Sequence, residues 1–94
     1  MAKAIWRGIV LAESDHTKIV EGNHYFPSES VAKRYLRPCS AHTECPWKGL
    51  ASYYDIVVGN AVNEQAAWYY AEPKPAAIEI KNHIAFWKGV KVVP

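Results

Sequence analysis

The 94-residue sequence has few of the residues that common nucleotide-processing motifs require. It contains only two aspartates, Asp15 and Asp55, and no D-x-D or D-x-E pair. Enzymes that transfer phosphoryl or nucleotidyl groups generally hold Mg²⁺ with several carboxylates. Neither a G-x-x-x-x-G-K-[ST] loop nor a G-x-G-x-x-G turn occurs, which argues against a P-loop or a dinucleotide-binding domain.

The sequence also has little net charge and no long apolar run. Its formal charge is +2 and its basic residues are scattered apart from "KRYLR" at 33–37. Proteins that bind nucleic acid usually cluster Lys and Arg, so we expect no nucleic-acid partner. No run approaches the ~18 apolar residues of a membrane span, so we expect no membrane partner. With two cysteines, and an opening "MAKAIWRG" that lacks the apolar stretch of a secretory signal, we expect a cytoplasmic protein.

Aromatic and apolar residues are abundant in this short chain. Half of the residues are apolar, and four Trp, six Tyr and two Phe contribute large side chains for a core. The length suits one small domain, and no linker or low-complexity segment divides the chain. We therefore predict a single domain over 1–94 that needs no cofactor.

The β-rich segments predict a fold made mostly of antiparallel strands. The segments 4–14 and 18–22 are expected to pair as a hairpin. A second hairpin is predicted over 50–63, because Gly59 and Asn60 suit a tight turn. Strands are also expected over 66–72 and 83–93, the last bent at Gly89.

Two short helices are predicted beside these strands. One begins at Ser28, a good N-cap, and ends before Pro38, and the other begins at Pro75. Residues 38–46 show no periodicity and are predicted to form a loop. The expected class is α+β, mostly β: a small antiparallel barrel or two packed sheets, with two short helices.

A W-[RK]-G triplet occurs three times, at Trp6–Gly8, Trp47–Gly49 and Trp87–Gly89. On a strand, the Trp would point inward and the adjacent basic residue to water, while Gly permits a sharp bend. Three such corners are expected to bring their indoles together in the core.

Four blocks of sequence resemble a known family. They are "AIWRGIVLAES", "VEGNHYFP", "HTECPWKGLASYYD" and "AAWYYAEPKPAAIEIKNHIAFWKG". In this order, and over nearly the whole chain, they resemble the bacterial domain-of-unknown-function family 427, which is sometimes labelled nucleotidyltransferase-like. The resemblance implies a small, mostly β domain without an established activity. We do not expect the nucleotidyl transfer that this label implies, because the sequence lacks the carboxylates that the reaction would need.

Cys45 is the candidate nucleophile of the chain. A neighbouring imidazole or ammonium would increase its thiolate fraction, and His42 or His24 could act as its base. The alternative is a buried, inert cysteine. Cys39 could form a disulfide with Cys45, or the C-x2-H-x2-C spacing could bind zinc together with His24. Because that spacing is not a common zinc frame, we predict no metal site.

The polar and aromatic residues of the family-like blocks are the candidate binding site. A ring-lined pocket with a few polar anchors is typical of sites for small ligands. Trp47 would stack on a planar group, Lys48 would meet negative charge, and Asp55 or His24 would bind hydroxyl or amino groups. The predicted set is His24, Cys45, Trp47, Lys48, Tyr54 and Asp55.

The leading functional hypothesis is thus a binding module for a small anionic or nucleotide-like ligand. One alternative is a thiol-dependent enzyme or redox protein that uses Cys45. Another is a structural or adaptor domain that associates with itself through its surplus aromatic residues, giving a homo-oligomer.

Overall fold

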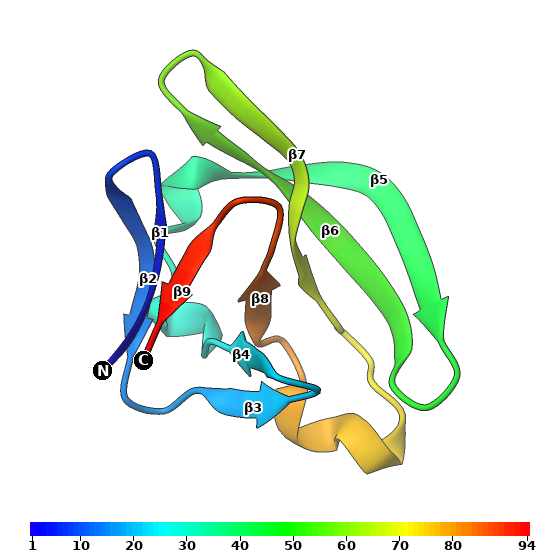
Figure 1. Ribbon diagram of the computed structural model, residues 1–94. Coiled ribbons are helices and arrows are strands. Elements are labelled where there is room, and N and C mark those ends of the chain that lie inside the picture. Colours follow the sequence, from blue (N-terminus) through cyan, green and yellow to red (C-terminus); the bar gives the residue numbers. More distant parts are fainter.

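The computed structural model describes all residues, Met1–Pro94, and is built mostly from antiparallel strands (Figure 1). Its radius of gyration of 12.4 Å is that of a compact chain of this length, about 12 Å. The strands are β1 (Ala2–Trp6), β2 (Ile9–Ser14), β3 (Lys18–Val20), β4 (Asn23–Tyr25), β5 (Leu36–Cys45), β6 (Gly49–Val58), β7 (Ala61–Tyr69), β8 (Ile84–Phe86) and β9 (Lys91–Val93).

The strands form three sheets, in the orders β2-β1-β9, β3-β4 and β5-β6-β7-β8. The mostly β class and the antiparallel pairing are confirmed, but the strands do not close into one barrel. No helix of the structure has the length and apolar character needed to cross a membrane.

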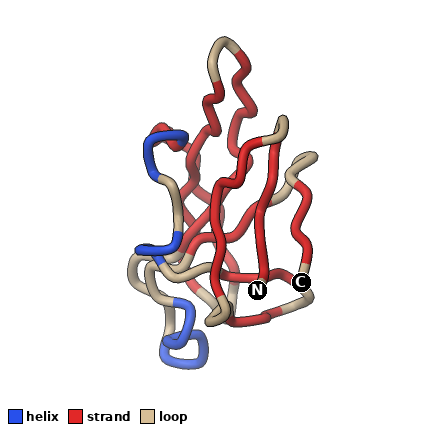
Figure 2. Tube along the Cα trace, turned by 90° about the vertical axis from the view of Figure 1, so that its left-hand side faces the viewer, coloured by secondary structure: helices blue, strands red, loops and turns tan.

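The two predicted helices are wrong. The structure has only 3₁₀ turns there, η1 (Ser28–Ser30), η2 (Lys33–Tyr35) and η3 (Pro75–Ile80), and Figure 2 shows them outside the strands. Val31 is extended, at φ −104° and ψ 132°, and forms an antiparallel bridge with Ala12. A helix in the short segment between Pro27 and Pro38 would be only marginally stable. Pairing with other strands therefore decides its conformation.

The predicted loop at 38–46 is also wrong, because all of it except Pro46 belongs to β5. It pairs with β6 from Leu36 opposite Ile56 to Cys45 opposite Gly49, with a bulge between Pro38 and His42. β5 is an edge strand and both of its faces are largely exposed. It therefore lacks the alternation of apolar and polar residues that marks a half-buried strand, and Pro is tolerated at such an edge.

The predicted pairing of 4–14 with 18–22 is wrong, because each segment lies in a hairpin of its own. The turn at Gly59 joins β6 to β7 as predicted. The segment 4–14, however, is a complete hairpin that turns at Arg7 and Gly8, and 18–25 is a second one that turns at Glu21 and Gly22. Arg7 and Glu21 adopt positive φ angles of 51° and 54°, which L side chains disfavour, so their sequences gave no strong turn signal.

The W-[RK]-G triplets bend the chain but do not bring their indoles together. All three glycines have positive φ. In each triplet the basic group lies over the preceding indole, at 5.8 Å for Arg7, 5.4 Å for Lys48 and 5.1 Å for Lys88. Trp87 packs edge-on against Trp68 instead, at 5.6 Å, and Trp47 and Trp87 are substantially exposed.

Each face of the four-stranded sheet carries a packed apolar cluster. Its first face packs against β1 and β2 through a cluster that includes Leu11, Phe26, Ile56, Ile84 and Phe86. Its second face packs beneath β4 and η3 through a smaller cluster, which consists of Tyr25, Ala51, Tyr70, Ala77, Ile80 and Ala85. The candidate site lies on this second face.

Candidate functional site

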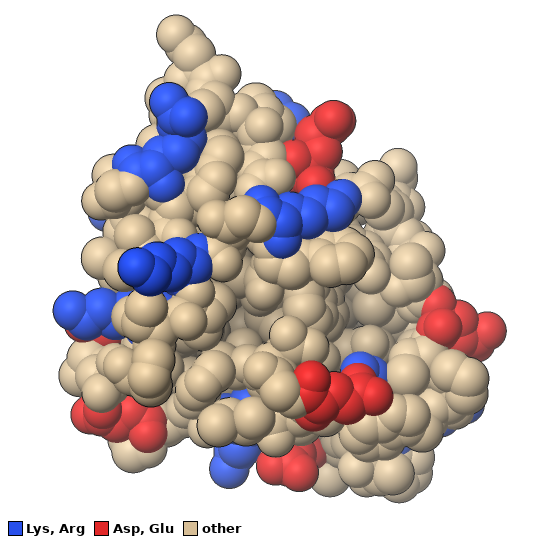
Figure 3. Space-filling model, in the orientation of Figure 1, with Lys and Arg blue, Asp and Glu red and all other residues tan.

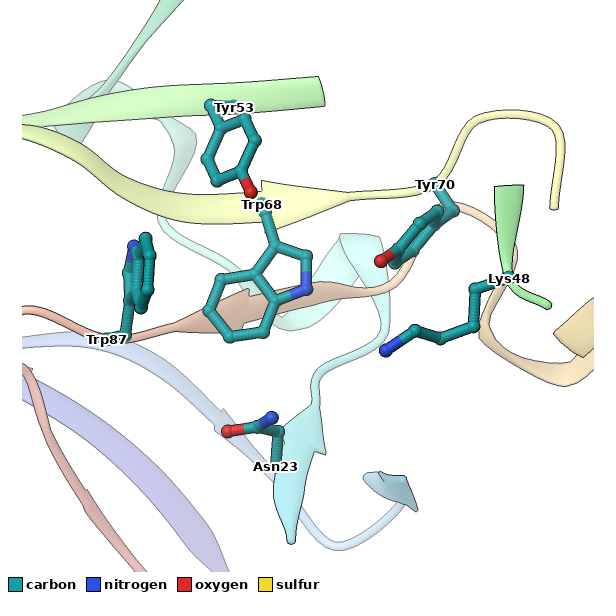
Figure 4. A pocket seen from close by; sticks show the side chains of 6 residues that line it. All are labelled: Asn23, Lys48, Tyr53, Trp68, Tyr70 and Trp87. Atoms are coloured by element: carbon teal, nitrogen blue, oxygen red, sulfur yellow. The ribbon is translucent and has the colours of Figure 1, made fainter. Parts of the chain in front are cut away.

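The main pocket lies on the second face of the four-stranded sheet and has a volume of about 260 Å³. Its lining consists of Asn23, Lys48, Tyr53, Trp68, Tyr70 and Trp87 (Figure 4). These residues come from β4, the β5–β6 turn, β6, β7 and the segments that follow β7 and β8. Residues far apart in sequence are thus brought together by sheet pairing.

Strand register builds the aromatic walls. Tyr53 on β6 pairs directly with Trp68 on β7, which pairs with Ala85 on β8. Directly opposed residues point to the same face, so both large rings stand above a small alanine. Two residues beyond Ala85, Trp87 reaches the same face, with its ring centre 6.5 Å from Tyr53 and 5.6 Å from Trp68.

The indole rings are held by their own hydrogen bonds. Trp68 Nε1–H donates to the Tyr25 hydroxyl at 3.1 Å, and Trp87 Nε1–H donates to the Gln65 carbonyl at 2.6 Å. Since both N–H donors are used within the chain, the rings offer a ligand mainly their faces and edges. Walls fixed in this way lower the entropy cost of binding.

Lys48 supplies the charge of the pocket. Its side chain is only 8% exposed, and its Nζ donates to the carboxylate of Glu21. The Nζ also lies 5.6 Å from the ring centre of Tyr70. The β5–β6 turn is fixed behind it, because the Lys48 carbonyl accepts the N–H of Lys74 at 2.9 Å.

The charge state of Lys48 follows from these contacts. Burial acts to lower the pKa of Lys48, but the hydrogen bond to Glu21 and the nearby Tyr25 and Tyr70 outweigh it, so the pKa lies above its ordinary value. Lys48 is therefore a cation at neutral pH. The same hydrogen bond and charge lower the pKa of Glu21, and burial raises the pKa of Tyr70.

Of the six residues predicted to bind a ligand, only Lys48 lines the pocket. Trp47 is next to it, stacked over the ammonium from outside, and Cys45 packs against the second-face cluster without lining the hollow. Tyr54 packs on the first face, stacked on Tyr69 at 4.9 Å.

The remaining two predicted residues have structural partners. His24 Nδ1 is 2.9 Å from Thr17 Oγ1. Asp55 accepts the Gln65 N–H at 2.9 Å and an Arg37 N–H at 3.1 Å. Both contacts link neighbouring segments of the fold.

The hydrogen bonds of Cys39 and His42 lead to different partners on β6. Both thiols are free, and Cys39 Sγ donates to the Tyr53 carbonyl at 3.3 Å. His42 Nδ1 is 3.2 Å from Ser52 Oγ. No group of three His, Cys, Asp or Glu side chains lies close enough to hold a metal ion.

The set of binding residues predicted from the sequence omits five of the six pocket residues. Trp68 and Tyr70 stand two apart in "AAWYYAE", a spacing that places them on one face of a strand. The sequence does not give the register that sets Trp68 against Tyr53, nor the turn that brings Asn23 beside Lys48.

Fold and site together define a small antiparallel β domain with an aromatic-walled pocket that ends at a buried lysine. The chain belongs to the family described as Domain of unknown function (DUF427), whose model matches residues 1–93. This confirms the resemblance found in the sequence. No curated protein matches the chain.

The Asp55 carboxylate is expected to make the free energy of unfolding depend on pH. The hydrogen bond from the Gln65 N–H is the main cause that lowers the pKa of Asp55, and Arg37 lowers it further, although burial acts to raise it. A lowered carboxyl pKa stabilises the folded state above the ordinary pKa of about 3.9, and the benefit is lost as pH falls through the lower folded value. Asp55→Ala should reduce the free energy of unfolding by about 1–3 kcal/mol at neutral pH.

Urea unfolding at neutral pH and in acid measures this effect. The difference between Asp55→Ala and wild type should shrink as pH falls below about 4. Asp15→Ala is the control, because Asp15 is exposed and 3.4 Å from the chain's amino group. A deficit for Asp55→Ala that is equally large in strong acid would contradict the role given to the carboxylate.

Proposed function

We propose that this protein is a binding module for a small ligand that carries a flat ring and an anionic group, such as part of a nucleotide. The observation that carries the proposal is that the two ends of the pocket differ: one end is aromatic and the other holds the Lys48 ammonium. Trp87 and Tyr53 lie toward one end, Lys48 and Tyr70 toward the other, and Trp68 between them (Figure 4). A ring at the aromatic end would direct its carboxylate, phosphate or sulfonate toward Lys48.

The chemistry of the lining supports this class of ligand. Aromatic faces stack on flat rings with little loss of conformational entropy. A buried ammonium forms charge-assisted hydrogen bonds, which are about twice as strong as neutral ones, and the amide of Asn23 can bind a second polar atom. At about 260 Å³ the pocket is slightly below the usual range of about 300–1,000 Å³, so it suits one ring system.

The surface charge is consistent with a small ligand rather than a polymer. On the face in Figure 3, basic groups are scattered mainly over the upper half and acidic groups lie mainly around the lower rim. Neither sign forms a continuous track of the kind that follows a nucleic-acid backbone. Two free thiols are consistent with the cytoplasmic location that we also propose.

NMR of the indole N–H groups tests the proposal, because the four Trp residues report separately. Benzenesulfonate, phenyl phosphate and nucleoside monophosphates are the probes. We expect saturable shifts of the Trp68 and Trp87 signals, while Trp6, which packs against the first-face cluster, serves as the internal control. Probes that leave both pocket signals unmoved, or move all four alike, would refute the proposed function.

A further inference from the structure

Glu21 lies where it can compete with a ligand for Lys48. Its carboxylate accepts a hydrogen bond from Lys48 Nζ, the ammonium to which the proposed function assigns the ligand's anionic group. The two partners differ in environment, because the side chain of Lys48 is 8% exposed and that of Glu21 is 53% exposed. The lysine is thus fixed in the fold, while its partner reaches in from the surface.

The turn between β3 and β4 places Glu21 at its tip. Glu21 has a φ of 54° in the turn between β3 and β4, a region that Gly and Asn enter far more readily than Glu. From this position the Glu21 side chain reaches the Lys48 ammonium.

The surroundings of the turn allow the carboxylate to leave. The sheet of β3 and β4 has only these two strands, each three residues long. A Cβ added at Gly22 would meet nothing within 4 Å, so the tip of the turn projects into open space. Rotation of the Glu21 side chain into water requires no rearrangement of the core.

We infer that Glu21 is an internal competitor of the ligand: its carboxylate pairs with Lys48 in the empty pocket and is displaced by the anionic group of a bound ligand. This inference rests on the proposed function and adds a determinant of selectivity to it. A ligand must outcompete Glu21, so anions whose charged group does not reach Lys48 are rejected. A neutral ring that leaves Lys48 alone meets no such competition.

Glu21→Gln tests the inference with two matched probes. Benzenesulfonate remains an anion at all accessible pH values, and benzenesulfonamide is its neutral counterpart. If Lys48 is free of Glu21 in about a tenth of the molecules, removing the competitor raises the apparent affinity for benzenesulfonate on the order of tenfold. The affinity for benzenesulfonamide should stay the same.

Glu13→Gln is the control, because it removes the same charge from an exposed ion pair with Lys3 on another sheet. It should change neither affinity. Unchanged or weaker sulfonate binding by Glu21→Gln, with the pocket indoles still responding, would overturn this inference and leave the proposed function intact. No response of the indoles in either protein would refute both.

A measurement on the wild-type chain covers the case in which Glu21→Gln does not fold. The pKa of the Glu21 carboxyl is lowered by Lys48, and ¹³C NMR follows its titration. Saturating benzenesulfonate should raise this pKa toward the ordinary value, since the carboxylate then lies in water. A pKa that stays low while the probe occupies the pocket would overturn the inference.

Discussion

Replacing Lys48 with methionine is expected to weaken the binding of benzenesulfonate by about ten- to a hundredfold, which corresponds to the loss of a charged hydrogen bond worth about 1.5–3 kcal/mol. Methionine retains most of the side chain's length and apolar contacts, so the pocket should keep its shape. The affinity for benzenesulfonamide should change little, because the neutral probe makes no ion pair. Calorimetric titration of both probes measures the two effects.

Lys74→Met is the matched control for this prediction. The Lys74 ammonium is exposed and donates to the Pro46 carbonyl at 2.6 Å, and Lys74 does not line the pocket. The control removes the same charge from the chain and should reduce sulfonate binding only slightly. Equal losses in both variants would mean that net charge, rather than the buried ammonium, attracts the anion.

Replacing Phe26 with alanine is expected to lower the free energy of unfolding by about 3–5 kcal/mol, the usual cost of deleting a buried phenyl ring. Phe26 is fully buried, and its ring packs edge-on against Phe86 with the centres 5.8 Å apart. Its N–H and carbonyl each bond to Ile84 at 2.8 Å. The substitution therefore weakens the contact that fixes β4, and with it Asn23, beside β8.

Most small domains have a total stability of only about 5–15 kcal/mol, so Phe26→Ala should unfold at a much lower urea concentration. Ile78→Ala is the control, because Ile78 on η3 is 60% exposed, and surface changes usually stay within about 0.5 kcal/mol. If the two variants unfold at similar urea concentrations, Phe26 does not have the central packing role that the structure gives it.

The sequence predicted the parts of the fold that local signals determine. Gly59 marks a hairpin, and the turn between β6 and β7 lies there in the structure. Val31 shows the limit of local signals. Its spacing to Tyr35 fits a helix, yet its bridge with Ala12 holds it extended.

The candidate site was predictable only in part, because it depends on register. Lys48 was found from its own neighbourhood in sequence. Trp87 and Asn23 were missed because bulges and tight turns bring them to the pocket. The bulge at Gln65, with a φ of 55°, shifts the register of β7 against β6 between Tyr54 and Ile56, and no pattern of apolar residues reveals it.

The most direct test of the central claim is the contact between a bound ring and the two pocket indoles. Nuclear Overhauser effects can be recorded between the ring protons of benzenesulfonate and the wild-type chain. We expect effects to Trp68 and Trp87, and to the side-chain methylenes of Lys48 only from the ring protons beside the sulfonate. Binding without any contact to the two indoles, or with the ring turned so that its sulfonate lies away from Lys48, would contradict the account.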